Sequence, residues 1–292
     1  TAINRGVTAH DLPDGVEYLV GDRSSDLSAL GGRVFDATVD VTAYRPSDVA
    51  RLAESGVTVG HYVQVSSVSA YADPRLPGAT EETAVLHPDG GVDPDAPMSG
   101  ETYGPLKAAA ERAGKRAFTD VAIVRPTYVV GAHDVTLRFP YWVARARRGG
   151  TVAVPGPERS AMQYVDARDL GDFVARLVAR GVLDDFHVAG PWPATTFAHK
   201  VRLVVDRVGP RGTSVEVVSP ESVRAQGLEH KFPLWSGGGD EAGLAIDPSK
   251  ALVAGLTLRP LEDSVAEVDD WWSDREWPGR WLTPDEERSL LG

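Results

Sequence analysis

The sequence predicts a doubly wound α/β protein, in which helices cover both faces of a parallel sheet. Over the first 131 residues, short and almost continuously apolar runs alternate with helical patterns. This alternation is typical of parallel sheets that are buried on both faces. The pattern loosens after Gly131, and a chain of 292 residues is long enough for a second, smaller lobe at its C-terminal end.

The expected elements follow one another in a regular order, each strand a short apolar run and each helix a stretch of helical periodicity. Strands are expected at 16–20, 34–44, 61–71, 121–131 and 186–190. Helices are expected at 46–56, from about Thr102 onward, at 137–150 and at 165–181, with a short helix within 21–32 and a long surface loop at 72–100.

Two discontinuous domains are expected. The first takes residues 1–131 and about 164–190, and the second takes about 132–163 and 191–292, with an irregular, aromatic C-terminal third. A doubly wound sheet that binds a dinucleotide starts with a strand, a glycine-rich turn and a helix. The chain instead starts on "TAINRG", which resembles the tail of a strand followed by a turn. We therefore expect the first strand, turn and helix upstream of Thr1.

Composition excludes several classes of function. The chain has no cysteine, which excludes disulfides, thiolate catalysis and cysteine zinc sites. Its net charge of −12 argues against a general affinity for nucleic acid or anionic membranes. No run of eighteen apolar residues or signal peptide is visible, so the cytoplasm is the expected location. The histidines lack the spacing of ligands, so no metal is expected.

Tyr103 and Lys107 stand four residues apart in "ETYGPLKAAAE". Residues i and i+4 share a helix face, and Pro105 fits only in a first turn, so Thr102 is the expected N-cap. An ammonium near a phenol lowers the tyrosine pKa from about 10. Such a tyrosine can exchange a proton with a hydroxyl or carbonyl. By itself, however, the pair also fits an ordinary surface helix.

Serines precede the pair in "VQVSSVSAY", where the expected strand 61–71 meets solvent. A serine hydroxyl there can hydrogen-bond the same carbonyl oxygen as the tyrosine, although the ordinary role of such a serine is to cap a turn. Serine at the end of a strand, followed by tyrosine and lysine on the next helix, is a far more specific pattern than the pair alone. It indicates an active site.

With these motifs the sequence resembles the extended short-chain dehydrogenase/reductase superfamily, of the NAD(P)-dependent epimerase/dehydratase type. The resemblance runs through the whole chain, on "NRG", "VGDRSSD", "FDATVDVTAY", "VSSVSAY", "YGPLK", "VRPTYVVG", "QYVDARDL" and "FHVAGP". It implies a Rossmann-like dinucleotide-binding domain and a C-terminal substrate-binding lobe. It also implies that Ser67 binds the reacting oxygen, with Ser69 on the substrate side. Tyr103 would be the acid/base, and Lys107 would hold the nicotinamide ribose and tune the tyrosine.

The resemblance implies cofactor contacts as well. Asp22, with Arg23 beside it, matches the residue that meets the adenine amino group. Other positions match the loops along the ribose, the pyrophosphate and the nicotinamide amide: Val41, Thr42, Ala43, Pro126 and Val129. The departure from the family is the missing glycine-rich turn, whose backbone N–H groups would bind the pyrophosphate.

The turn after the first strand bears on the choice of cofactor. In this fold an acidic residue there binds the ribose 2′-OH, and a basic one favours a 2′-phosphate. Asn4 and Arg5 occupy the turn, and no Asp or Glu occurs before His10. A guanidinium fork suits a phosphate, so NADP(H) is the predicted cofactor. NAD(H) stays open, since a solvated Arg5 would also fit the sequence.

In the second lobe, His133, Arg159 and Gln163 occupy positions where relatives often bind substrate. Arg159 could pair with a phosphate or a carboxylate, although a surface arginine and a turn histidine fit the pattern equally well. Most of the seven tryptophans lie near the C-terminus, where they are expected to pack the lobe rather than to hold a ligand.

The predicted reaction is hydride transfer between a nicotinamide and a carbon that bears a hydroxyl or a carbonyl. Epimerisation and net reduction both fit, and a dehydratase fits less well because "SSVSAY" offers no additional acid. Nucleotide-sugars and secondary-metabolite ketones stay open as substrates, and so does a homodimer. The alternative is a non-catalytic relative that binds a nucleotide or associates with RNA.

Overall fold

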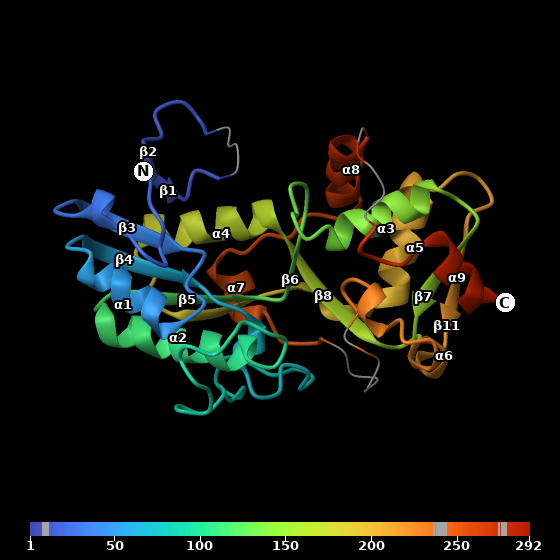
Figure 1. The fold of residues 1–292 in the computed structure, drawn as a ribbon, viewed down its shortest axis with the longest axis horizontal. Helices are drawn as coiled ribbons and strands as arrows, with labels where there is room; N and C mark the ends of the chain where they lie inside the picture. The colour runs from blue at the N-terminus through green and yellow to red at the C-terminus, as the bar shows by residue number, and fades with distance from the viewer. Residues whose placement is uncertain (8–11, 236, 238–243, 274, 276–278) are drawn as a thin grey trace. The chain divides into compact units, whose positions relative to one another are not determined.

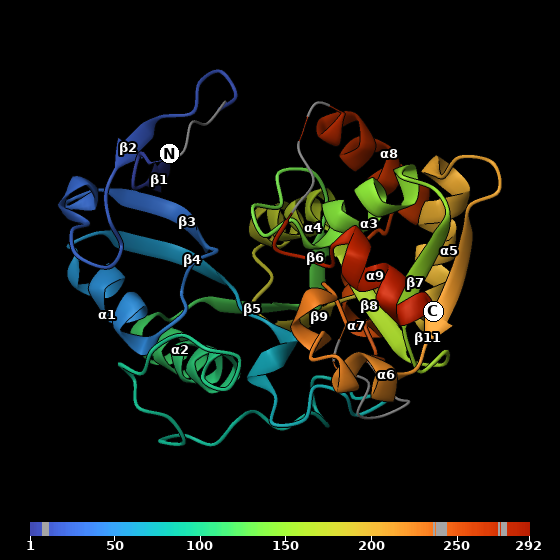
Figure 2. The same cartoon turned by 45° about the vertical axis from the view of Figure 1, so that its right-hand side comes forward.

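The computed structural model describes residues 1–292 except 8–11, 236, 238–243, 274 and 276–278. The chain divides into two compact units. Unit 1 takes Thr1–Pro74, Ala84–Arg125 and Val174–Phe186, and unit 2 takes Arg75–Thr83, Pro126–Phe173 and His187–Gly292. Figures 1 and 2 label most of the helices and strands of both units. Among the described residues, no helix is both long and apolar enough to span a membrane.

Unit 1 is built on parallel strands. Its larger sheet consists, in spatial order, of β3 (Val34–Asp40), β4 (Thr58–Val65), β5 (Val121–Pro126) and β9 (Asp185–Val188). β3 runs parallel to β4, and β4 to β5. A separate parallel pair is formed by β1 (Ala2–Asn4) and β2 (Tyr18–Val20). A parallel sheet interleaved with helices confirms the predicted α/β class.

Two helices pack side by side on one face of the larger sheet, α1 (Pro46–Glu54) and α2 (Tyr103–Ala117) (Figures 1 and 2). Short 3₁₀ turns form at η1 (Ser28–Leu30) and η2 (Val68–Ala70). Tyr62 of β4 is fully buried, with its ring 4.3 Å from that of Phe118. This contact packs the C-terminal end of α2 against β4.

Unit 2 contains two small sheets. One has the order β10 (Gly190–Thr196), β8 (Ala161–Asp166), β6 (Tyr128–Val130), and the other pairs β7 (Thr151–Pro155) with β11 (Ser214–Val218). The helices are α3 (Arg138–Arg147), α5 (Phe197–Val208), α6 (Pro220–Ala225), α7 (Ser249–Ala254), α8 (Leu261–Trp272) and α9 (Pro284–Leu291), with η3 at Glu229–Lys231. Trp142 of α3, Val201 of α5 and Val265 of α8 belong to one apolar core. The boundary between the units falls inside α4 (Ala167–Arg180).

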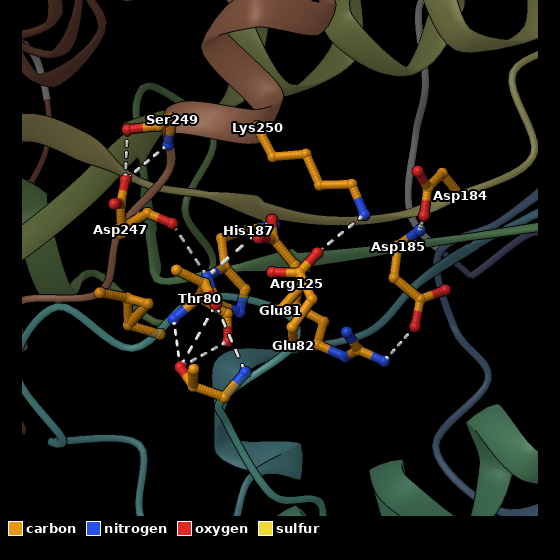
Figure 3. Close-up of polar contacts among 12 residues, drawn as sticks. Thr80, Glu81, Glu82, Arg125, Asp184, Asp185, His187, Asp247, Ser249 and Lys250 are labelled. Atoms are coloured by element: carbon orange, nitrogen blue, oxygen red, sulfur yellow. Dashed lines mark hydrogen bonds and ion pairs between the residues drawn. The ribbon is translucent and has the colours of Figure 1, made fainter.

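Hydrogen bonds explain why Arg75–Thr83 belongs to unit 2. The Gly78 N–H donates to the carbonyl of Ala245 at 2.7 Å, and the Asp247 N–H donates to the carbonyl of Ala79 at 3.0 Å. The backbone N–H of His187, a fully buried residue, donates to the Glu81 carboxylate at 2.6 Å (Figure 3). The segment is thereby attached through Gly78, Ala79 and Glu81 to residues of unit 2.

Several sequence expectations need correction. The expected strand 61–71 begins earlier and ends at Val65, because the serines that follow turn the chain into η2. The expected strand 121–131 is two strands, β5 and β6, which belong to different sheets. Residues 75–83, 126–131, 164–173 and 187–190 fall in unit 2, whereas the expected division gave them to the first domain.

The expectation of an irregular C-terminal third was wrong. Beyond residue 190 the described residues form helices α5 to α9, strand β11 and most of β10. Thr283 accepts the Glu286 N–H at 3.3 Å, and the Glu286 carboxylate accepts the Thr283 N–H at 2.7 Å, a capping box that starts α9. The expected packing role of Trp277, and most of the run "SGGGDEAG", lie outside the described residues.

Candidate active site

Ser67 lies in the turn that follows β4, in unit 1. It is the N-cap of η2, and its Oγ accepts the backbone N–H of Ser69 at 3.1 Å. The residue is buried, with 9 % of its surface exposed. The turn role considered for this serine is therefore real, but a hydroxyl that accepts a hydrogen bond still has its own proton to donate.

Tyr103 is the first residue of α2, as its spacing to Pro105 predicts. Its backbone N–H donates to the carbonyl of Ser99 at 3.0 Å. Thr102 occupies the N-cap position, but its hydroxyl donates to the carbonyl of Pro97 at 2.6 Å and does not cap the helix. The first turn is thus fixed by the backbone of 97–99 and by proline, and not by a capping side chain.

Lys107 follows one turn later, and its side chain is buried, with 2 % of the residue exposed. Its Nζ donates to the carbonyls of Ala43 and Val65, at 3.1 Å and 2.9 Å. Nζ also lies 4.8 Å from the ring centre of Tyr44, which in turn lies 6.3 Å from the Tyr103 ring. The lysine therefore ties α2 to the loops that follow β3 and β4.

Burial lowers the pKa of Lys107 to about 8, and the nearby carboxylates of Asp40 and Glu111 limit the decrease. At pH 7 most molecules still carry the ammonium. An ammonium has three N–H groups, and two of them are used in the bonds to Ala43 and Val65. The third is available to a ribose hydroxyl.

Gly104, between the tyrosine and the lysine, lets the helix approach the serine turn. A Cβ at this position would lie closer than 3.0 Å to the carbonyl oxygen of Ser69 and 3.1 Å from Nε2 of His87. Its backbone has no positive φ, so the requirement for glycine here is one of space. Gly104 is a site residue that the sequence analysis missed, although it lies inside the quoted motif.

A buried ion network fixes the same helix from its other side. The Arg125 guanidinium of β5 donates to the Glu111 carboxylate of α2 at 2.7 Å and 3.0 Å. It also donates to Asp185 at 2.8 Å (Figure 3) and to the hydroxyl of Tyr71 at 3.0 Å. Arg125 and Glu111 are almost fully buried. The network connects β5 and the residue after η2 to the helix that carries Tyr103 and Lys107.

The residues expected near the adenine already have partners within unit 1. The Asp22 carboxylate accepts the N–H and the hydroxyl of Ser24 at 2.8 Å and 2.6 Å, and these bonds lower its pKa. The Arg23 guanidinium donates to both oxygens of Asp40 and, at 3.0 Å, to the hydroxyl of Thr42. Val41 is exposed to 60 %. A direct contact of these residues with a cofactor stays a prediction.

Asn4 and Arg5 lie at the end of β1. Asn4 Oδ1 accepts the Gly6 N–H at 2.8 Å and the Tyr18 hydroxyl at 2.5 Å, which shapes the turn. Arg5 is exposed to solvent. This position is compatible with the predicted contact to a 2′-phosphate and leaves that contact untested.

The remaining predicted residues belong to unit 2. Pro126 ends β5, and Val129 of β6 pairs with Val165 of β8. His133 has a positive φ of 64°, and its ring lies 5.4 Å from that of Trp271. Whether they meet cofactor or substrate stays a prediction.

Gln163 and Arg159 differ sharply in exposure. Arg159 is exposed in the turn after β7. Gln163 is fully buried, and its amide exchanges hydrogen bonds of 2.8 Å and 2.9 Å with the backbone of Ile246. These bonds favour a structural role for Gln163, in which it anchors the segment before α7.

The arrangement in unit 1 fits the nicotinamide end of a dinucleotide. It offers a serine hydroxyl, a tyrosine at a helix start and a lysine with a free N–H, next to the carboxyl ends of β3 and β4. The described residues contain no cluster of three or more His, Asp or Glu side chains that could hold a metal ion.

Comparison with known proteins gives the family and the fold. The family model described as "NAD dependent epimerase/dehydratase family" matches residues 37–189, more than half of the chain. A search of curated proteins with the sequence finds no match.

Three solved structures are similar to the chain. UDP-N-acetylglucosamine 4-epimerase from Bacillus cereus matches with a TM-score of 0.63 and 17% identity, over 93% of this chain and 89% of that one. RMD from Pseudomonas aeruginosa, complexed with NADPH, matches with a TM-score of 0.60 and 17% identity, over 90% of each chain. WbmH from Bordetella bronchiseptica, in complex with NAD⁺, matches with a TM-score of 0.60 and 16% identity, over 93% and 89%.

These structures share the Rossmann-like α/β fold with this chain, which confirms the predicted fold class. The match of the family model over 37–189 includes the serine turn and the whole of α2. Together with the order of the motifs, it confirms the predicted resemblance: the chain belongs to the NAD dependent epimerase/dehydratase family of enzymes.

Proposed function

We propose that the protein is an NADP(H)-dependent epimerase or reductase that acts on a carbon bearing a hydroxyl or a carbonyl. The observation that carries the proposal is the close approach of the first turn of α2 to the Ser67 turn, made possible by Gly104. It keeps Tyr103 beside that turn, with Lys107 buried behind it.

Each residue has one task in this proposal. Ser67 donates its hydroxyl proton in a hydrogen bond to the reacting oxygen of the substrate. Tyr103 takes the proton of a substrate hydroxyl, or returns it to a carbonyl oxygen. Lys107 contributes the positive charge that stabilises the phenolate, and its third N–H binds the nicotinamide ribose. When bound, the nicotinamide supplies or accepts the hydride.

The choice between NADP(H) and NAD(H) rests on Arg5. A solvent-exposed guanidinium at the end of β1 can bind a 2′-phosphate, and no carboxylate of the turn is present to bind a 2′-OH. The neighbours do not decide the question, because RMD is complexed with NADPH and WbmH with NAD⁺.

The substrate class rests on one similar structure and on the exposure of Arg159. The similar structures include a UDP-N-acetylglucosamine 4-epimerase, and Arg159 is exposed and could bind a phosphate, so we propose a nucleotide-sugar over a secondary-metabolite ketone. Ser69, His133 and Gln163 stay candidate substrate residues, although the bonding of Gln163 favours a structural role. A cytoplasmic location and a homodimer stay predictions of the sequence.

Tyr103→Phe tests the proposal. Fluorescence of NADPH measures cofactor binding, and absorbance of the reduced cofactor follows a screen of nucleotide-sugars and ketones with the full-length protein. The variant should bind NADPH normally and lose at least about 10²-fold in turnover, since it lacks the group that moves the proton.

A second pair of variants separates catalysis from stability. Lys107→Ala should lose turnover and also cofactor affinity. Lys115 lies two turns further along the same helix, is half exposed and pairs with Asp185. Lys115→Ala should therefore retain both turnover and cofactor affinity. Near wild-type turnover of Tyr103→Phe would contradict the proposal. NADPH binding without turnover on any substrate would support the non-catalytic alternative.

A further inference from the structure

Tyr44 lies in the loop between β3 and α1, in the same unit as the proposed active-site residues. Nζ of Lys107 lies 4.8 Å from the centre of the Tyr44 ring, and the Tyr103 ring lies 6.3 Å from it on a tilted plane. Tyr44 is 41 % exposed, whereas Lys107 is 2 % exposed. The Tyr44 ring therefore contacts the buried ammonium and also reaches solvent.

Hydrogen bonds fix the backbone that carries this ring. The N–H of Tyr44 and the N–H of Arg45, the N-cap of α1, both donate to the Asp48 carboxylate at 2.9 Å. The Arg45 guanidinium donates to the carbonyl of Ala96 at 2.9 Å, and this bond ties the loop after β3 to the segment that leads into α2. The place of the ring is thus set by α1 and by the entry to α2.

The charged groups around Lys107 come from several elements. Carboxylates lie nearby on β3, α1 and α2, and a guanidinium lies in the loop after β2; these groups belong to Asp40, Asp48, Glu111 and Arg23. Each carboxylate has partners of its own. Asp40 pairs with Arg23, Glu111 pairs with Arg125, and Asp48 accepts the two N–H groups at the start of α1. The contacts of Nζ itself include two carbonyls and the Tyr44 ring.

An aromatic ring attracts a cation through the negative charge of its π face. The separation of 4.8 Å is inside the limit of about 6 Å for such contacts, and the attraction is stronger for a desolvated cation such as the buried Lys107 ammonium. A neutral amine does not gain this attraction, so the ring favours the protonated form. The face of the ring produces the effect, and the hydroxyl of Tyr44 is not needed for it.

We infer from this geometry that Tyr44 is a positioning residue, whose ring stabilises the Lys107 ammonium and so keeps a positive charge one helical turn from Tyr103. The use of this charge in the reaction rests on the proposed function, whereas the contact itself does not. Burial opposes the charge and lowers the pKa of Lys107 to about 8. Loss of the ring should lower this pKa further, by about one unit for a contact with a desolvated ammonium.

NMR measures the pKa of Lys107 directly. The full chain is labelled with lysine that carries ¹³C at Cε, and the signals are followed from about pH 6 to about pH 11. The chain has few lysines, namely Lys107, Lys115, Lys200, Lys231 and Lys250, and Lys107→Met identifies the signal of Lys107. Lys200, at the start of α5, is the internal reference because it belongs to unit 2.

Two variants of Tyr44 separate the ring from its hydroxyl. Tyr44→Leu keeps an apolar side chain and removes the π face, and the pKa of Lys107 should fall by about one unit, a tenfold change in the protonation constant. Tyr44→Phe keeps the π face and should leave this pKa unchanged. The pKa of Lys200 should be the same in both variants and in the wild type. Tyr44→Met replaces the leucine variant if that variant does not fold.

The pH profile of turnover is a second readout. Since the proposed function needs the ammonium, the alkaline limb of the profile should move about one unit toward lower pH in Tyr44→Leu and stay in place in Tyr44→Phe. A general loss of stability would lower turnover without this shift.

The outcomes separate this inference from the proposed function. An unchanged or higher Lys107 pKa in Tyr44→Leu overturns the inference, because the ring would then act only by excluding water. An equal fall in Tyr44→Phe also overturns it, because the hydroxyl would then be responsible. A lower Lys107 pKa with an unchanged turnover profile supports the contact and contradicts the role of the Lys107 charge in the proposed function.

Discussion

Gly104→Ala tests directly whether the approach of α2 to the serine turn matters. The added methyl group would lie closer than 3.0 Å to the Ser69 carbonyl oxygen and 3.1 Å from His87 Nε2. An unstrained contact between carbon and a carbonyl oxygen needs about 3.3 Å or more. The obstacle is backbone and not the end of a flexible side chain, so either the helix start or the turn must move by about 1 Å.

Two losses should follow from this displacement. Overpacking of a well-packed site costs typically about 1–3 kcal/mol in the free energy of unfolding. A misplacement of about 1 Å between reacting groups can cost about 10²-fold in rate, and here it would separate Tyr103 from Ser67. Turnover should therefore fall by about that factor, while NADPH affinity changes less.

Gly171→Ala is the matched control. Gly171 is an exposed helical glycine in α4 without a positive φ, and no neighbouring atom lies within 4 Å of the place that an added methyl group would take. Alanine there should stabilise the protein by about 0.5–1 kcal/mol. Urea unfolding followed by circular dichroism gives both changes, and NADPH absorbance gives turnover. If Gly104→Ala matched Gly171→Ala in stability and turnover, the close approach would have no role in the site.

Three further changes have expected outcomes. Because burial lowers the pKa of Lys107 to about 8, the unfolded chain binds more protons there up to about pH 10. Between pH 8 and 10, the free energy of unfolding measured with urea should therefore rise with pH more steeply in the wild type than in Lys107→Met. Parallel pH curves for the two proteins would contradict this. Arg5→Ala should weaken NADPH binding tenfold to a hundredfold, roughly the strength of a charge-assisted hydrogen bond, and leave NADH binding unchanged; equal losses for both cofactors would exclude a phosphate contact. Glu287→Gln leaves the buried Arg145 without its charge partner and should cost about 3–5 kcal/mol, whereas Asp285→Asn, in an exposed pair on the same helix, should barely move the urea midpoint; similar shifts would show that burial does not decide the effect.

The parts of the fold that the sequence predicts are those with local signals. The strands of unit 1 are apolar runs, and the start of α2 follows from Pro105 and the spacing of Tyr103 and Lys107. The helices of the C-terminal third carried local signals too. Thr283, Pro284 and Glu286 make a readable helix start, but the tryptophans and glycines nearby suggested irregular structure.

The details of the site depend on contacts between distant parts of the chain. Arg125 and Glu111 form a buried pair across 14 positions, and Arg125 reaches Tyr71 across 54. No periodicity shows that these side chains meet. The position of Tyr44 beside Lys107 likewise depends on the path of the loop after β3. The sequence could therefore offer Ser67, Tyr103 and Lys107 as candidate site residues, but not the residues that hold them in place.

Lys107 and Lys200 show why burial alone does not define the chemistry of a lysine. Both are at least 95 % buried, and both have a lowered pKa. Around Lys107, Asp40 and Glu111 compensate part of the cost of burial, so the ammonium persists at neutral pH. Around Lys200 the described residues provide no such charge, and the helix start adds a positive potential. The two lysines are therefore buried to a similar degree, but only the surroundings of Lys107 contain carboxylates that stabilise its ammonium.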